Sequence, residues 1–317
     1  MSKHKLLSVG IPTYKRAVEL QAVLNKAIGN GILECSKLII IDDGPTVGLE
    51  QSVQLLNKDI EFRQHSYNKG YAHTFIELIE ACTTEYMMLT VDDDFINVKE
   101  VNGIIDYLST HKPDFISTAW LVNNKVHRGR SSIAPISYKE VGPASIHAPG
   151  LIYKIESVKP YLSFLRSRLE INCTATQFMP QVILVYLLKF ANKKCLWHPA
   201  PLVSQGLAAP SNIKDDLSNH YSSFIGRYKS TISYISLFDE LSSSSLLDKL
   251  GQEKANAVKN QFETELFKRV SSGLNNPKIN DLWVAAAVVS AVKNPVQTSR
   301  KIFNYFAVVY KNKKILQ

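Results

Sequence analysis

The sequence of 317 residues predicts an α/β fold, in which helices cover both faces of an open, mostly parallel β-sheet and a mainly helical region follows. Two observations support this prediction. Short apolar runs rich in β-branched residues alternate with amphipathic segments of helical length over residues 1–120. These runs are continuously apolar, which is typical of parallel strands that are buried on both faces.

The individual elements follow from these patterns. The predicted strands of the first part are residues 6–11, 37–43, 60–66, 85–92 and 114–120. The predicted helices between them are residues 17–28, 47–58, 70–82 and 98–111. The segment 121–150 is rich in Gly, Pro and Ser, and we expect loops and short antiparallel strands there.

The second half of the chain has a different character. A further strand is expected at 150–155, a buried helix at 181–192, and a last strand with its exit loop at 195–206. From about residue 215 the pattern is mostly helical. We therefore expect one domain over residues 1–205 and a mainly helical region over residues 206–317.

The composition is that of a soluble globular protein, with 45% apolar and 21% charged residues. Four scattered cysteines form no zinc-binding pattern and are typical of reduced thiols in the cytosol. The apolar run 6–11 stops at Pro12, too early for a signal peptide, and the run 282–292 is shorter than the roughly 20 residues that cross a bilayer. A cytoplasmic location is the resulting expectation.

The net charge of +9 is unevenly distributed, because no acidic residue follows Asp281. The basic and partly aromatic segment KIFNYFAVVYKNKK suits an anionic membrane surface, which predicts peripheral binding at the inner face of the membrane. The alternative is a helix that caps the core and carries a solvated basic end. Nucleic acid is disfavoured as a partner because the basic residues form no dense patch.

Polar residues follow four of the predicted strands. They are Pro12 to Tyr14, Asp42 to Gly44, His65 to Gly70, and Asp92 to Asp94. The carboxyl ends of parallel strands meet at one edge of a sheet, where α/β proteins bind their ligands. We therefore expect these four groups to form one site.

The three consecutive aspartates in YMMLTVDDDFINV need an explanation of their own. Two carboxylates roughly 4 Å apart repel by about 4 kcal/mol at an effective dielectric constant near 20. A bound cation would offset this repulsion. The alternative is a cap on the helix that begins near residue 97, but a cap needs only one aspartate.

The motifs VGIPTYKR, IIIDDG, NKG and DDD, in this order, resemble those of the family 2 glycosyltransferases, enzymes of the GT-A fold that use nucleotide-activated sugars. The resemblance covers roughly residues 5–205. It implies that the D-x-D pair Asp92 and Asp94 binds a divalent cation, Mn²⁺ or Mg²⁺, together with the donor diphosphate. A late histidine often completes such a site, and His220 is a better candidate than His198.

The resemblance also implies a set of nucleotide-binding residues. These are Pro12, Thr13, Tyr14, Arg16, Asp42, Asp43, Asn68, Gly70, Asp92 and Asp93. Tyr14 would stack on the base, while Asp42 or Asp43 would accept hydrogen bonds from uracil or ribose. Lys69 and His73 lie near enough in sequence to offset the negative charge of the donor phosphates. The chain departs from the family at Phe75-Ile76, where an Arg-Asn pair is usual.

The resemblance leaves several candidates for the catalytic base. An inverting transferase needs a group that takes the proton of the acceptor hydroxyl. The family usually carries a Glu-Asp pair there, but the matching segment 172–194 contains no acid. Glu170 is the first candidate and Asp93 is grouped with it as a catalytic residue. Asp215 and Asp216 lie downstream, and Gln177 or Gln181 stands where the base is expected.

The predicted function is transfer of a sugar from a nucleotide donor, with UDP-sugars favoured, to a glycan or lipid-linked acceptor in surface-polysaccharide synthesis. The helical region would serve as a lid, a membrane-binding element or an oligomer contact. A binding subunit that has lost its base remains an alternative, as does a sugar nucleotidyltransferase, although PTYKR lacks the Gly-rich loop of that class. No G-x-G-x-x-G supports a dehydrogenase.

Overall fold

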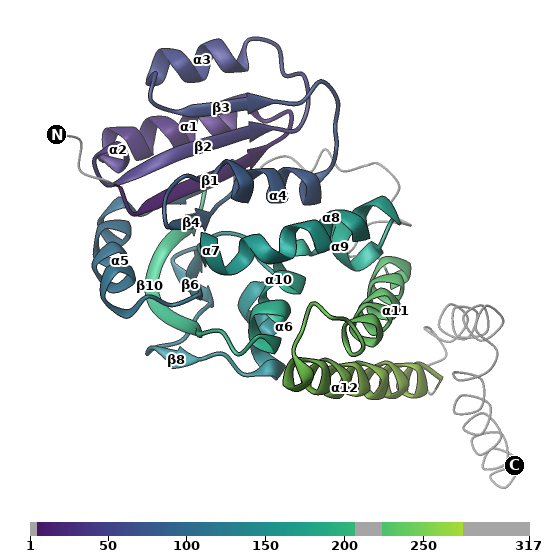
Figure 1. The fold of residues 1–317 in the computed structure, drawn as a ribbon. Helices are drawn as coiled ribbons and strands as arrows, with labels where there is room; N and C mark the ends of the chain where they lie inside the picture. The colour runs from purple at the N-terminus through teal and green to yellow at the C-terminus, as the bar shows by residue number, and fades with distance from the viewer. Residues whose placement is uncertain (1–4, 207–223, 275–317) are drawn as a thin grey trace, which may run out of the picture. The chain divides into compact units, whose positions relative to one another are not determined.

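The computed structural model describes residues 5–206 and 224–274. Its centre is one sheet in the order β3-β2-β1-β4-β9-β6-β10-β5, with β7 paired to β6 and β8 paired to β10 (Figure 1). The strands are β1 Leu7–Thr13, β2 Ser36–Asp42, β3 Glu61–Gln64, β4 Tyr86–Leu89, β5 Asp94–Ile96, β6 Phe115–Val122, β7 Lys125–Arg128, β8 Ala134–Pro135, β9 Leu151–Lys154 and β10 Cys195–Gln205. The predicted α/β class is confirmed.

Helices lie on both faces of this sheet. One face carries α1 Ala17–Gly29, α2 Ile32–Cys35 and α5 Val98–His111, with α3 Leu49–Leu56 packed against α1. The other carries α4 Tyr71–Ala81, α8 Leu162–Glu170, α9 Thr174–Phe178 and α10 Pro180–Phe190. The shorter elements are α6 Val141–Ser145, α7 Ile155–Val158 and the 3₁₀ turns η1 Tyr138–Glu140 and η2 Lys159–Tyr161.

The direction of one strand was not predicted. β9 runs antiparallel to both of its neighbours, β4 and β6, so the sheet is mixed at its centre. An apolar run indicates burial on both faces but carries no information about direction. β5 and α2 were also missed, since three and four residues are too short to show a period.

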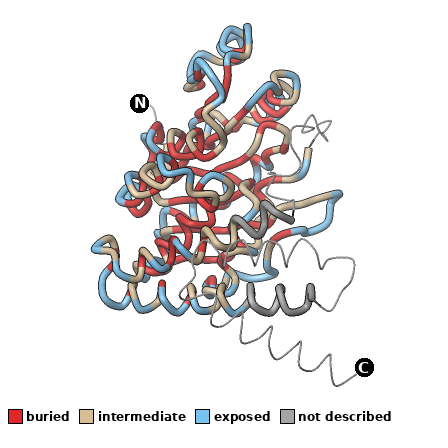
Figure 2. Tube along the Cα trace, turned by 90° about the vertical axis from the view of Figure 1, so that its right-hand side faces the viewer, coloured by how far each residue is buried: buried red, intermediate tan, exposed pale blue. Residues whose placement is uncertain are grey.

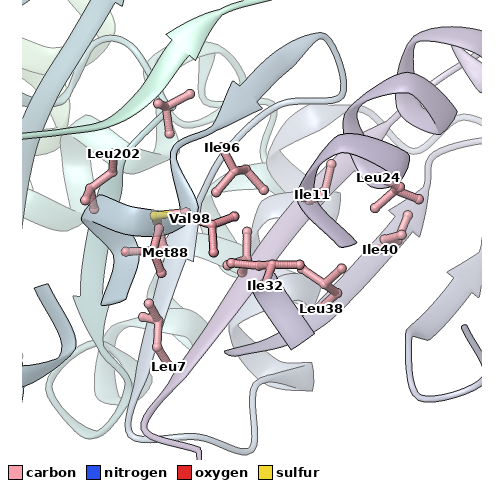
Figure 3. Packing of buried hydrophobic residues seen from close by; sticks show 14 of the residues in the cluster. Leu7, Ile11, Leu24, Ile32, Leu38, Ile40, Met88, Ile96, Val98 and Leu202 are labelled. Carbon is pink, nitrogen blue, oxygen red and sulfur yellow. The ribbon is translucent and has the colours of Figure 1, made fainter. Parts of the chain in front are cut away.

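The core between the sheet and the α1, α2 and α5 layer is built from alternate residues of the strands. Leu7 and Ile11 of β1 and Leu38 and Ile40 of β2 point into it (Figure 3), and Val9 of β1 belongs to the same cluster. The neighbouring residues of β1 face α4, where Gly10 leaves room for Met87 and Leu78. Because both faces are covered, the strands form the most deeply buried part of this unit (Figure 2).

The chain divides into two compact units. The first comprises residues 1–215 with 247–251, and the second comprises 216–246 with 252–317. The second unit contains α11 Phe224–Leu241 and all of α12 Lys249–Leu274 beyond Gly251, and these helices pack through the rings of Tyr234, Phe238 and Phe262. Within the part of the chain that the structure describes, no helix is both long and apolar enough to cross a bilayer.

Candidate functional site

The ends of β1, β2 and β4 bring the first predicted residues together. Thr13, the last residue of β1, pairs with Asp42 at the end of β2. On its other side, the Thr13 hydroxyl donates a hydrogen bond of 2.8 Å to Oδ2 of Asp92. Parallel register therefore places the motifs PTY, DDG and DDD side by side, as their positions after the strands predict.

Arg16 supplies positive charge to the aspartates. It directly precedes α1, and its Nη1 lies 3.1 Å from Oδ1 of Asp92 and 2.9 Å from Oδ2 of Asp93. Burial raises the pKa of Asp92, although the Thr13 hydrogen bond and the Arg16 charge offset part of that effect. One guanidinium therefore serves two carboxylates, whereas Asp94 makes no ion pair among the described residues, although the charge of the buried Arg128 also acts on it.

That third carboxylate, Asp94, begins β5 and lies opposite Gln205 of β10. Its oxygens accept hydrogen bonds from the Trp120 indole at 3.1 Å and from the Gly206 backbone N–H at 3.3 Å. Gly206 passes so close to the Asp93 carbonyl that a side chain would not fit. Burial, together with the charge of Asp93, raises the pKa of Asp94 to about 6.

This charge balance fits a divalent cation. The described residues contain no group of three metal-ligating side chains, so a cage made only of protein ligands is absent from that part of the chain. Mg²⁺ and similar ions are commonly held by one or two carboxylates, with phosphate oxygens and water completing the shell. Asp94 and Asp92 would hold the ion in this way. His220, the third predicted ligand, lies outside the described residues, as do Asp215 and Asp216.

Asp43 organises the loop that follows β3. Its Oδ1 accepts hydrogen bonds from the Lys69 N–H at 2.8 Å and from His65 Nδ1 at 3.0 Å, and its Oδ2 accepts from the Gly70 N–H at 2.9 Å. Asn68 also accepts from the Gly70 N–H, at 2.8 Å. Both oxygens of Asp43 are therefore engaged by the protein itself, which the sequence did not indicate.

Asp42 differs from its neighbour. Oδ2 accepts hydrogen bonds from the Thr46 N–H at 3.1 Å and from Gln64 at 2.8 Å. Oδ1 is buried without a partner among the described residues. A buried carboxylate oxygen rarely stays unpaired, so Asp42 is better suited than Asp43 to accept a hydrogen bond from a ligand.

Tyr14 offers an aromatic surface beside these carboxylates. Its side chain is 38% exposed, and Gly44 packs against its ring so closely that a Cβ there would lie 2.9 Å from Cε2. A hydrogen bond from Asn68 lowers the pKa of Tyr14. The loops after β1, β2 and β3 thus meet around one ring. Lys69, a predicted phosphate partner, instead places its Nζ 3.0 Å from Glu77.

The candidate bases lie elsewhere. Glu170 is exposed at the end of α8, and no hydrogen bond or ion pair among the described residues joins it to the aspartates. Gln177 is also exposed, whereas Gln181 is buried and donates to the Ile146 carbonyl at 3.1 Å. His198 packs against Tyr107, with the ring centroids 4.9 Å apart, which is typical of a structural histidine.

Several residues near the aspartates escaped sequence analysis. They are Trp120, His127, Arg128 and His147, all at the end of β6 or in the segment that follows it. That segment lacks periodicity, so nothing indicated which of its side chains pack around Trp120. A tryptophan at the end of a predicted strand was the one available signal.

Known proteins resemble this chain in sequence and in fold. Residues 8–144 match the sequence model described as Glycosyl transferase family 2. The resemblance to family 2 glycosyltransferases is confirmed. The matched segment contains all four motifs, from Pro12 to Asp94, and supports a glycosyltransferase activity. No curated protein matches the chain.

Solved structures share the fold at low sequence identity. S. aureus TarS matches with a TM-score of 0.59 and 14% identity, over 92% of this chain and 50% of TarS. S. aureus TarS 1-349 in complex with UDP-GlcNAc matches with a TM-score of 0.55 and 13% identity, over 89% of this chain and 79% of that chain. The Pyrobaculum calidifontis mannosyltransferase PcManGT in complex with GDP-Man and Mn²⁺ matches with a TM-score of 0.51 and 13% identity, over 98% of this chain and 82% of that chain.

Arg16 provides a test of the charge balance. Replacing it by methionine is expected to destabilise the protein by about 1–2 kcal/mol at pH 7, since Asp92 and Asp93 lose their only described cation. The loss should shrink as the pH falls and the carboxylates become protonated. Urea unfolding at pH 7 and pH 4 measures the loss of stability at each pH. R63M is the control, because the pair of Arg63 with Glu61 is exposed, and an equal loss in both variants would contradict this interpretation.

Proposed function

We propose that this protein transfers a sugar from a nucleotide-diphosphate donor, a UDP-sugar by preference, to a glycan hydroxyl in a metal-dependent, inverting reaction. The observation that carries the proposal is the excess of buried carboxylate at Asp92 and Asp94 beside Thr13 and Tyr14. A site that holds more negative charge than Arg16 neutralises favours a cation and, with it, a diphosphate. The family match and the donor complexes of TarS 1-349 and PcManGT support the same activity.

Each group of the site has a role in this proposal. Tyr14 stacks on the base, and the free oxygen of Asp42 accepts a hydrogen bond from the base or ribose. Pro12 lies in β1 next to its last residue, Thr13, and leads into the base-binding loop, while Asn68 and Gly70 belong to the loop that Asp43 anchors. Arg16 holds Asp92 and Asp93 in place. A Mn²⁺ or Mg²⁺ ion at Asp92 and Asp94 would stabilise the negative charge of the departing diphosphate.

Thermal unfolding with nucleotides tests this proposal. UDP, GDP, CMP and dTMP are each added with Mn²⁺ and, separately, with EDTA. A ligand at about 100 times its dissociation constant stabilises by roughly 2.7 kcal/mol, which raises the melting temperature by several degrees. We expect a rise with UDP that requires the metal. The absence of a rise with every nucleotide would contradict the proposal.

A second candidate is a binding subunit that retains the donor site without catalysis. The absence of any acid in residues 172–194, and the buried amide of Gln181 in that segment, favour it. Release of UDP from a UDP-sugar distinguishes the two, because a binding subunit binds UDP but releases none from the donor. The nucleotidyltransferase alternative receives no support from the family match.

The acceptor and its location are proposed from charge alone. The basic segment 300–314 would hold the protein at an anionic membrane, where lipid-linked glycans are extended in surface-polysaccharide synthesis. This segment lies outside the described residues. Deleting it should abolish binding to vesicles that contain anionic lipid and leave binding to neutral vesicles unchanged. Unchanged binding to the anionic vesicles would contradict the membrane role.

A further inference from the structure

Three aromatic rings form a cluster next to Asp94. The ring centroids of Trp120 and His147 lie 5.0 Å apart, those of Trp120 and His127 lie 5.1 Å apart, and those of the two histidines lie 5.4 Å apart. The Trp120 indole is also the hydrogen-bond donor to Asp94. Two imidazoles therefore lie one ring away from the acidic cluster that the proposed function assigns to the donor diphosphate.

The loop that carries His147 is held firmly by buried side chains. Arg128 is 5% exposed and donates to the carbonyl oxygens of His147 and Pro149, and to that of Thr118 at 3.1 Å. Gln181 of α10 donates to the Ile146 carbonyl at 3.1 Å. The backbone on both sides of His147 is thus fixed to β6, β7 and α10, and its half-buried ring has a defined position against Trp120.

The two histidines differ in their surroundings. His127 is exposed on β7, whereas His147 is half-buried and its carbonyl is bound to Arg128. Burial lowers the pKa of His147, and the nearby charges of Arg128 and His127 lower it further. At neutral pH the ring is therefore the free imidazole, which is the form that accepts a proton.

The carboxylates of the region are unsuited to the same task. Asp92 and Asp93 are paired with Arg16, and Asp94 is held by Trp120 and Gly206. Gln181, one of the two glutamines in the segment where the resemblance expects a base, is an amide that donates to the Ile146 carbonyl. Glu170 is exposed at the end of α8.

We propose that His147 is the catalytic base that accepts the proton of the acceptor hydroxyl; this inference rests on the proposed function. The acceptor oxygen forms a bond to the anomeric carbon as the bond from that carbon to the diphosphate oxygen breaks. The electron pair of the broken bond leaves with the nucleoside diphosphate. The hydroxyl proton moves to a ring nitrogen of His147, and the imidazolium then releases it to solvent.

The test uses water as the acceptor, so that the natural acceptor is not needed. Release of UDP from UDP-GlcNAc and UDP-glucose with Mn²⁺ is measured for the full chain and for H147A, H127A, E170Q and H111A. His111 is exposed at the end of α5, stacked on Tyr107, and serves as the matched control. Metal-dependent binding of UDP is measured for each variant by thermal unfolding.

We expect H147A to lose at least about 10²-fold in UDP release while UDP binding changes less than twofold. Added imidazole should restore part of the rate in H147A only, since a merely structural defect is not repaired by a free base. Retained release in H147A, loss without rescue, or a rescued loss in E170Q or H127A would overturn the inference. A wild-type protein that binds UDP but releases none would also overturn it. If the wild type fails to bind any nucleotide, the proposed function itself fails.

Discussion

Replacing Asp94 by asparagine is expected to make the metal-free protein more stable at pH 7 and to abolish its metal-dependent response to UDP. The pKa of Asp94 is about 6 in the folded protein, against an ordinary value of 3.8. A raised pKa means that the stabilising contribution is complete below about pH 4 and is lost as the pH rises through 6. At pH 7 the folded state therefore carries an unfavourable ionised carboxylate, which asparagine removes.

The expected gain is about 1 kcal/mol, because solvent screening reduces the full value of the pKa shift. Thermal and urea unfolding in EDTA at pH 7 and pH 4 measure it, and the difference between wild type and D94N should vanish at pH 4. D106N is the control, since Asp106 is exposed on α5. In the presence of Mn²⁺ and UDP the order should reverse, with wild type more stable than D94N.

A functional carboxylate is identified when its replacement raises the stability of the metal-free protein and lowers the stability in the presence of Mn²⁺ and UDP. A helix cap would lose stability on replacement in both conditions, since the cap stabilises the fold with or without ligand. A buried carboxylate of a binding site destabilises the folded state until its ligand binds. If D94N is less stable than wild type in EDTA at pH 7, Asp94 has a structural role and the cation site must lie elsewhere.

The sequence was informative where a regular element positions a side chain. The burial of β1, β2 and β4 could be predicted from their composition, and parallel register then brings Thr13, Asp42 and Asp92 together without further information. Arg16 was assigned to the nucleotide by resemblance alone, and its pairing with Asp92 and Asp93 could not be predicted, because the turn between β1 and α1 decides which carboxylates it meets.

Residues placed by irregular backbone could not be predicted. Trp120 and His147 meet only because the chain between β6 and β9 folds back, and its path depends on the bonds of Arg128 to three carbonyl oxygens. Such hydrogen bonds join residues that have no fixed spacing along the sequence, so no sequence pattern predicts them. The antiparallel direction of β9 has the same origin, since it follows from where that returning chain enters the sheet.

Replacing Asp43 by alanine is expected to lower the free energy of unfolding by about 3–5 kcal/mol. Asp43 is 6% exposed and accepts hydrogen bonds from Lys69, Gly70 and His65. Its removal leaves the Lys69 N–H and Nδ1 of His65 without their acceptor, while the Gly70 N–H keeps only Asn68. The melting temperature should fall by about 10 °C without any nucleotide present.

D43N and D59A complete this experiment. Asparagine keeps one acceptor oxygen but turns its amide toward a donor, so D43N should lie between D43A and wild type. Asp59 is exposed, and D59A should remain within about 0.5 kcal/mol of wild type. The result separates two roles for Asp43. A stability near that of wild type, combined with loss of UDP binding, would show that Asp43 contacts the nucleotide directly. A large loss in the absence of nucleotide means that Asp43 acts by anchoring the loop from Asn68 to Gly70, and that Asp42 is the carboxylate left for the ligand.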